Sequence, residues 1–166
     1  MIDSRGLTLT ELAVVIVILA IACVLSIPAI GVWKRKYDVE TTVKEMYNAL
    51  SEARMTAFNQ KRVCGLVWSG SSPNQVTLRC DTDEDGDITN AGGFENLWTK
   101  TLKLSLDENF NGTMCAFSIK GFAVDVNSQG SFFYSGADAQ PEYGCVVVER
   151  SRIKMGSWES GQCTLR

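Results

Sequence analysis

The sequence contains no histidine and only three prolines. Without histidine, the chain cannot form a Ser-His-Asp triad, a Cys-His dyad or a histidine zinc site. The net charge of −3 is small, so no overall excess of positive charge indicates a nucleic-acid-binding protein. No nucleophile–base pair or phosphate-binding loop is recognisable either. These absences predict that the protein is not an enzyme.

The six cysteines are widely spaced, and no two of them form a C-x-x-C pair. Their spacing excludes zinc ribbons and thioredoxin-like motifs. Cys23 lies inside an apolar run and is expected to behave as a small hydrophobic residue. For the other five, the simplest interpretation is two disulfides and one free thiol in an oxidising compartment. The alternative is a set of reduced cysteines in the cytosol.

One long apolar segment dominates the N-terminal part of the chain. It is unbroken from Leu12 to Leu25 and continues more weakly to Trp33. Counted from Leu9, it is long enough to cross a hydrocarbon core, which requires roughly 20 residues. The basic residues 34–36 follow it, and the positive-inside rule would place the rest of the chain in the cytoplasm. The cysteines favour the opposite side.

Three features of this segment are unusual for a simple anchor or a secretory signal. The preceding residues 1–6, interpreted as a leader peptide, carry no net charge. Glu11 lies just inside the apolar segment, where a carboxylate costs about 2.5–3.5 kcal/mol at the membrane centre and less near an interface. Pro28 interrupts the second half, and a proline removes one backbone hydrogen bond from a helix. Glu11 is therefore expected to have a function and a charged partner.

The stretch from Gly6 to Leu12, GLTLTEL, resembles the signature of the type IV pilin family. In that family, a prepilin peptidase cuts after the glycine, and the new N-terminus is methylated. The resemblance implies cleavage between Gly6 and Leu7, methylation of Leu7, and Glu11 as the fifth residue of the mature chain. Pro28 falls where the family commonly has a helix-loosening proline. Leu7 is a departure, because phenylalanine is usual at that position.

The resemblance also implies a role for Glu11. In the membrane, its carboxylate would attract the N-terminal amine of a neighbouring subunit, so that each group neutralises a charge otherwise stranded in an apolar medium. This pairing would also set the axial register between subunits. The alternative is a lone glutamate whose side chain reaches the lipid headgroups.

The same family implies a location and a set of partners. The chain would be a single-pass protein of the bacterial inner membrane with a periplasmic C-terminal domain, and would also occur in a type IV pilus or a type II secretion pseudopilus. Its partners would be other pilins or pseudopilins, the prepilin peptidase and the inner-membrane assembly platform. Its function would be structural, as a minor pilin or pseudopilin that initiates or joins the filament.

A second helical pattern begins after the apolar segment. Apolar residues recur at spacings of four and three and form one stripe: Val39, Val43, Met46, Leu50, Ala53 and Ala57. We expect one helix from about Thr8 to Lys61, roughly 80 Å long at 1.5 Å per residue. Its first half, residues 7–33, requires lipid or other helices around it. Its second half, residues 34–62, must pack on a domain through one face.

From Val63 the pattern changes toward a period of two, which indicates strands. Turn residues separate the candidate strands, which are 63–68, 75–80, 97–106, 114–119, 122–126, 130–134, 144–150 and 152–155. We expect an α+β fold in which residues 63–166 form an antiparallel sheet, or two small packed sheets, covered by the helix stripe. This layout resembles the GspH-type pseudopilins of type II secretion and the FimT/FimU group of minor pilins.

The cysteines of the β-rich part suggest two disulfide bonds. We predict that Cys64 bonds to Cys80 across the first hairpin and that Cys145 bonds to Cys163 at the C-terminal end. Cys115 is then left over, although it could replace one of these partners. Each bridge would contribute about 2–4 kcal/mol to the free energy of unfolding.

Residues 81–87, DTDEDGD, match the first half of a calcium-binding loop. The acids that could form the site are Asp81, Asp83, Asp85, Asp87 through its backbone carbonyl, and Glu95. Gly92 stands where the loop needs its bidentate acid, so Glu95 would have to reach back. The alternative is a solvated hairpin with local side-chain-to-backbone bonds. A similar acidic turn is common in GspH-type pseudopilins. Calcium is the only cofactor that the sequence suggests.

Arg150, Arg152 and Lys154 alternate, so an unbroken strand would place all three on one face. FimT-like proteins that bind DNA carry an Arg-x-Arg motif preceded by glycine, and here Glu149 replaces that glycine. A DNA-uptake receptor is therefore the alternative to a purely structural subunit, with phosphate contacts from these residues. The remaining interpretation is a solvated strand face.

Overall fold

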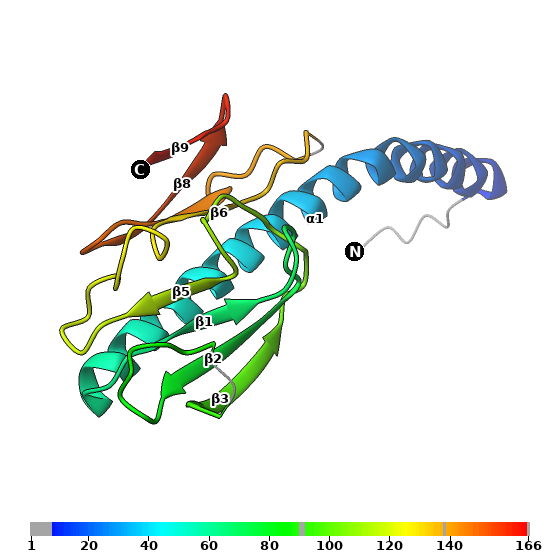
Figure 1. Ribbon diagram of the computed structural model, residues 1–166. Helices are drawn as coiled ribbons and strands as arrows, with labels where there is room; N and C mark the ends of the chain where they lie inside the picture. Colours follow the sequence, from blue (N-terminus) through cyan, green and yellow to red (C-terminus); the bar gives the residue numbers. More distant parts are fainter. Residues whose placement is uncertain (1–7, 90–91, 138, 166) are drawn as a thin grey trace, which may run out of the picture.

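The computed structural model describes residues 8–89, 92–137 and 139–165, with the side chains of residues 24–30 left out of the description. These residues form one helix followed by strands in two antiparallel sheets. The predicted α+β class, with a long N-terminal helix packed on antiparallel sheets, is confirmed (Figure 1).

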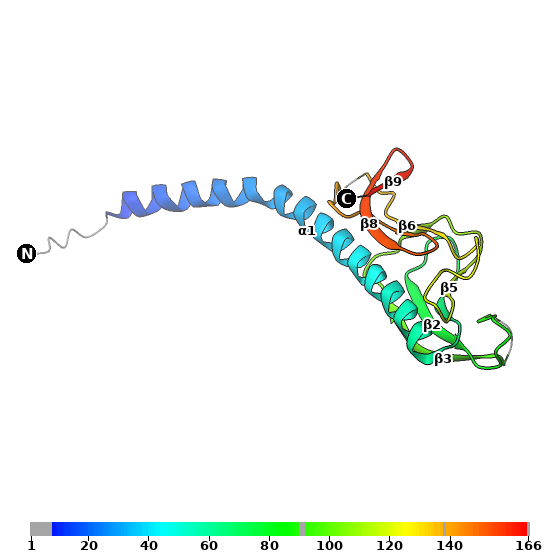
Figure 2. The same ribbon diagram turned by 90° about the vertical axis from the view of Figure 1, so that its left-hand side faces the viewer.

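Helix α1 (Leu9–Gln60) contains 52 residues, which corresponds to about 78 Å at 1.5 Å per residue. It ends at Lys61, whose left-handed backbone conformation (φ 55°) turns the chain into the first strand. The predicted apolar stripe is confirmed, because all six of its side chains are fully buried. Only the second half of α1 packs on the domain, and the first half extends away from it (Figure 2).

The first sheet has the strand order β3-β2-β1-β5 and the second the order β4-β6-β7-β8-β9. The strands of the first sheet are β1 (Cys64–Trp68), β2 (Gln75–Asp81), β3 (Phe94–Thr101) and β5 (Met114–Phe117). Those of the second are β4 (Asp107–Glu108), β6 (Gly130–Phe133), β7 (Cys145–Val148), β8 (Ile153–Glu159) and β9 (Gln162–Leu165). Helix α1 contacts strands of both sheets, so its stripe forms the shared core.

An aromatic cluster and a short connecting segment join the two sheets. Trp68 of β1 packs against Phe132 of β6 with ring centroids 4.8 Å apart. The backbone N–H of Ala123 donates to the carbonyl of Arg150 beside the second sheet, and the next N–H donates to Ala116 of the first sheet. The two sheets therefore form one domain around the end of α1.

Several strand predictions differ from the structure, among them the missed two-residue strand β4 and the longer β8. Segment 122–126 is not a strand, since only Ala123 forms a bridge to Phe117 while the larger apolar side chains around it are exposed. Strand β3 begins at Phe94 and ends at Thr101, so the stretch to residue 106 was predicted wrongly as strand. Strand β9 was missed, although the Ser160-Gly161 pair, with positive φ at both residues, suits a tight hairpin turn.

Candidate functional site

Helix α1 begins with a reciprocal cap between Thr8 and Glu11. The Thr8 hydroxyl oxygen accepts a hydrogen bond from the Glu11 backbone N–H at 3.3 Å. In return, Glu11 Oε2 accepts bonds from the Thr8 backbone N–H at 2.9 Å and from the Thr8 hydroxyl at 2.8 Å. Such a capping box satisfies donors that lack partners at a helix start. It fixes both the first residue of α1 and the place of the Glu11 carboxylate.

The other residues of the predicted processing motif fall outside the described part of the chain. Gly6 and Leu7 lie there, so cleavage between them and methylation of Leu7 stay predictions. The side chain of Pro28 also lies outside the described residues, and α1 continues through its position. Within this motif the structure therefore places Glu11.

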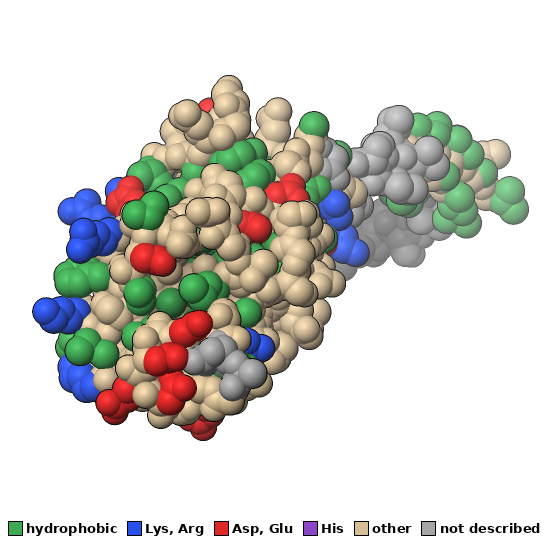
Figure 3. All heavy atoms as spheres, viewed as in Figure 1, with side chains coloured by type: hydrophobic (Ala, Val, Ile, Leu, Met, Phe, Trp, Pro, Cys, Tyr) green, Lys and Arg blue, Asp and Glu red, His purple; other side chains and the backbone are tan. Residues whose placement is uncertain are grey.

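The first half of α1 exposes its apolar side chains on every side. Leu9 is 85% exposed, and each large apolar side chain described up to Trp33 is about half exposed or more. They are Leu12, Val14, Val15, Ile16, Val17, Ile18, Leu19, Ile21, Val32 and Trp33. Figure 3 shows hydrophobic side chains on the end of the molecule that extends beyond the domain. An apolar surface of this extent marks a place where other molecules pack.

Among the residues whose side chains are described, no helix offers an apolar stretch long enough to cross a membrane. The predicted membrane segment 7–33 includes residues 7 and 24–30, which lie outside that set.

The acidic turn after β2 is organised around the carboxylate of Asp81. Its Oδ1 accepts bonds from the backbone N–H groups of Asp83 at 3.1 Å and Glu84 at 2.9 Å, and Oδ2 accepts one from Gly86 at 2.7 Å. Asp81 is buried, whereas Asp83, Glu84 and Asp85 are exposed. The expected local side-chain-to-backbone bonds are thus present, and they hold the turn in shape.

In this turn, the pKa values of two neighbouring acids are shifted in opposite directions. Burial disfavours the charged form of Asp81, but the bonds from Gly86, Glu84 and Asp83 outweigh it and lower the pKa of the Asp81 carboxyl. The pKa of Asp83 is raised by loss of hydration, by its hydrogen bond with Asp81 and by the charge of Asp85. The turn therefore holds one readily ionised carboxyl beside one that resists ionisation.

Part of the predicted calcium-binding set comes together in this turn. Carboxylate oxygens of Asp81, Asp83 and Asp85 lie within 4.8 Å of one another, so each residue could offer one ligand. Calcium takes six to eight oxygen ligands, and three carboxylates supply a minority of them. The three residues fit one side of a calcium site.

Of the other two predicted calcium ligands, Glu95 is engaged elsewhere, and Asp87 was predicted to bind through its backbone carbonyl. The Asp87 carboxylate accepts a bond from the Thr89 backbone N–H at 2.7 Å. Glu95 Oε2 accepts a bond from Arg62 Nη2 at 3.0 Å. The expectation that Glu95 reaches back to the turn is therefore wrong, because the ion pair with Arg62 holds it beside the end of α1.

Both predicted disulfides, Cys64–Cys80 and Cys145–Cys163, are present. Cys115 is buried and free, and its thiol donates to the carbonyl oxygen of Ser128 at 3.3 Å. Burial raises the pKa of the Cys115 thiol, which keeps it protonated and unreactive. The remaining free cysteine is the exposed Cys23 on α1.

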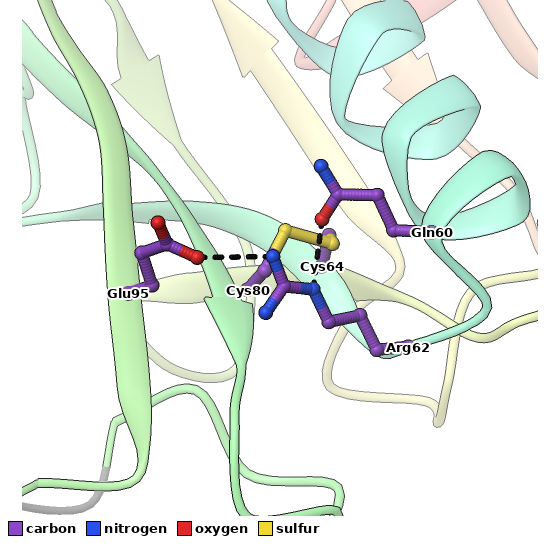
Figure 4. Close-up of a disulfide and its surroundings, with 5 residues drawn as sticks. All are labelled: Gln60, Arg62, Cys64, Cys80 and Glu95. Carbon is purple, nitrogen blue, oxygen red and sulfur yellow. Dashed lines mark hydrogen bonds and ion pairs between the residues drawn. A yellow bond between two sulfur atoms is a disulfide. The ribbon is translucent and has the colours of Figure 1, made fainter.

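Figure 4 shows the first disulfide, which joins β1 to β2 close to the end of α1. Cys64 and Cys80 face each other directly in the register of β1 and β2. Arg62 lies beside the bridge, and donates to Gln60 Oε1 at 2.8 Å and to Glu95 at 3.0 Å. The turn between α1 and β1 is therefore fixed by one covalent bond and two polar contacts.

The basic residues proposed for DNA do not form one row on a strand. Arg150 and Arg152 lie in the turn between β7 and β8, which the Glu149 N–H closes by donating to the Arg152 carbonyl at 2.8 Å. Lys154 lies on β8 and forms an ion pair with Glu149 at 3.5 Å. An unbroken strand was the condition for all three to share one face, and it is not met, because this turn separates β7 from β8.

Sequence reasoning missed the polar contacts that hold α1 on the domain. Trp98 Nε1 donates to Glu52 Oε1 at 2.9 Å, and the Glu142 backbone N–H donates to Glu40 Oε1 at 2.9 Å. Arg35 Nη2 donates to the Tyr134 hydroxyl at 2.9 Å. These partners lie 46 to 102 residues apart in the sequence, and no local pattern indicates them. Comparisons with protein-family models, with curated proteins and with solved structures found no match.

Proposed function

We propose that this protein is a structural subunit of a type IV pilin-like filament, as a minor pilin or a pseudopilin. The observation that carries the proposal is the division of one helix into two surfaces. Its second half buries a complete apolar stripe in the domain, while its first half exposes apolar side chains on all sides. The exposed half suits packing in a lipid bilayer and then among the equivalent helices of other subunits.

Glu11 supplies the specific interaction for this packing. Both contacts that its carboxylate makes with Thr8 use Oε2, and Oε1 takes part in neither. In the proposed filament, Oε1 accepts a bond from the N-terminal amine that cleavage creates at Leu7 of a neighbouring subunit. Charge neutralisation then offsets the roughly 2.5–3.5 kcal/mol that a carboxylate costs deep in a membrane. A subunit therefore gains stability when it leaves lipid for the filament.

The two disulfides support a location for the domain. Disulfides persist in oxidising compartments such as the bacterial periplasm, and they are rare in the cytosol. In the proposed topology the domain lies on the periplasmic side, and α1 passes through the inner membrane. The partners of the chain are then other pilins or pseudopilins, the prepilin peptidase and the assembly platform.

The intact mass of the chain purified from its native membrane tests this proposal. The expected mass corresponds to loss of residues 1–6 and one added methyl group on Leu7. Gly6→Ala is the matched variant, and it should retain the leader while the domain still folds. A native chain that keeps residues 1–6 would contradict the proposal.

A further inference from the structure

A groove lies on the domain where the end of α1 meets the second sheet. It has a volume of about 450 Å³ and runs between α1 residues 47–58, the turn of Lys120 and Gly121, and Ile153 of β8. Gly121 has a φ of +74°, and a Cβ added there would lie 3.4 Å from Arg54 Nε. The glycine therefore lets the Arg54 side chain lie directly against the turn, where it forms part of the groove wall.

Two positive side chains line this groove, and two more belong to the turn that leads into it. Arg54 and Lys120 line it, and Arg150 and Arg152 stand in the turn just before Ile153. The N–H of Ala123 donates to the Arg150 carbonyl at 2.9 Å, which holds that turn beside the segment after Lys120. Within the described residues, none of these four side chains forms an ion pair. We call this surface the basic groove.

Exposed apolar side chains flank the basic groove. On α1, Met55 is 61% and Phe58 is 49% exposed, and beside the turn Ile119 and Phe122 are each more than 40% exposed. These side chains belong to the folded domain, apart from the protruding half of α1. Apolar area together with several unpaired cations is typical of a surface that binds an acidic protein segment.

The same chain carries a segment of opposite charge on another part of the domain. The acidic turn, residues 81–87, holds five carboxyl groups within seven residues. Asp83 and Glu84 are exposed there and form no ion pair with any described residue. Figure 3 shows acidic side chains at the lower end of the domain and basic side chains along its left edge. The groove and the acidic turn consist of different residues, so they are separate surfaces of one domain.

We propose that the basic groove binds the acidic turn of a second copy of this chain. Because the groove and the turn are different surfaces, the contact is heterologous, and each copy keeps one groove or one turn free for the next. Such a contact generates an open chain or a ring of domains. It goes beyond the proposed filament function, since it joins folded domains and does not involve Glu11.

Nucleic acid fits the same groove less well. Two cations line the groove and two more lie in the adjoining turn, next to Glu149, on a chain whose net charge is −3. A long polyanion that extended across the domain to the acidic turn would be repelled by its five carboxyl groups. A single compact turn of a second copy meets the four cations without that repulsion.

Zero-length cross-linking of the full chain in detergent tests the contact. Chains labelled with ¹⁵N and unlabelled chains are purified separately, mixed, and treated with a carbodiimide, which joins an amine to a carboxylate in contact. Mass spectrometry should find Lys120 of one isotopic form joined to residues 83–87 of the other. Cross-links confined to single chains, or their absence at Lys120 while DNA binds the groove, would overturn the proposal.

Charge reversal supplies the matched variants. Arg54→Glu with Lys120→Glu should lower the yield of mixed-isotope cross-links by at least about tenfold, which corresponds to about 1.4 kcal/mol. Lys100→Glu, a reversal on β3 outside the groove, should leave the yield unchanged. Mixing the groove variant with a chain that carries Asp83→Lys and Asp85→Lys should restore the cross-link. The groove then supplies the carboxylate and the turn supplies the amine. Equal yields in all pairs would show that the groove does not hold the turn.

The Glu11→Ala chain separates this inference from the proposed function. It should lose filament assembly and still form the cross-link between Lys120 and the acidic turn. Loss of the cross-link in Glu11→Ala, with the domain folded, would contradict an independent domain contact. Filament assembly that continues in the charge-reversed groove variant would leave the proposed function intact.

Discussion

The two halves of α1 share one backbone geometry and face opposite environments. In the second half, the apolar side chains form one stripe, and the domain buries all of them. In the first half, they lie on all sides of the helix, and the same chain covers none of those described. A helix that is apolar all round needs lipid or protein from another molecule. The first half therefore depends on partners, while the second half depends on its own domain.

The largest expected contrast comes from shortening one leucine in each half. Leu50→Ala removes a fully buried side chain from the core and should lower the free energy of unfolding by about 3–5 kcal/mol. Leu19→Ala, at a side chain that is 58% exposed, should change it by less than about 0.5 kcal/mol. Urea titration of both full-length variants in detergent, followed through tryptophan fluorescence, measures the difference. Similar losses of unfolding free energy in both variants would contradict the proposed difference between the two halves.

The cysteines offer a second contrast, between the folded domain and the protruding half of α1. Replacing Cys145 and Cys163 by alanine opens a loop of 18 residues and should lower the free energy of unfolding by about 3 kcal/mol. Replacing Cys23 by alanine on the protruding half should leave it unchanged, because that side chain is exposed. Thiol counting in denaturant without reductant should find two free cysteines in the natural chain. Five or six would contradict the disulfides.

A smaller effect is expected at Asp81, whose carboxylate accepts hydrogen bonds from the backbone of its own turn. Asp81→Asn removes the charge that accepts three backbone bonds, and it should cost about 1–2 kcal/mol near neutral pH. Because the pKa of Asp81 is lowered in the folded state, its stabilisation is present above the ordinary aspartate value of about 3.9 and is lost as pH falls below it. The pH dependence of urea unfolding should therefore flatten below that value in the variant.

Asp83→Asn is the matched control for Asp81→Asn. The pKa of Asp83 is raised, so its ionised form opposes folding near neutral pH. The variant should unfold at the same or a slightly higher urea concentration than the natural chain. A loss at Asp83 equal to that at Asp81 would show that the turn depends on its total charge and not on the Asp81 bonds.

The sequence predicted the parts of the fold that depend on short-range periodicity. The stripe through Val43 and Leu50 repeats within one helix, and both are fully buried as expected. The pairing of Cys64 with Cys80 follows from a hairpin of 16 residues. Segment 122–126 shows the limit, since its alternation is real but Ala123 faces inward while Phe122 and Val124 are exposed. Alternation alone does not show which face is buried.

The candidate sites also differ in how far apart their residues lie in the sequence. The Thr8–Glu11 cap and the Asp81 turn use residues within five positions of each other, so their local contacts could be inferred from the sequence. The basic groove brings Arg54 beside Lys120 and Ile153, which lie 66 and 99 positions later in the chain. The packing of α1 across both sheets brings these residues together, and no short sequence motif predicts that surface.

Glu11 and Glu52 give the most direct comparison, because one carboxylate is assigned to a neighbouring subunit and the other binds Trp98 of its own domain. The measurement is the amount of each full-length variant recovered in sheared filaments relative to the membrane fraction. Glu11→Ala should keep the domain folded and be lost from filaments, while Glu52→Ala, on the packed half, should be recovered normally. Normal recovery of Glu11→Ala in filaments would contradict the account.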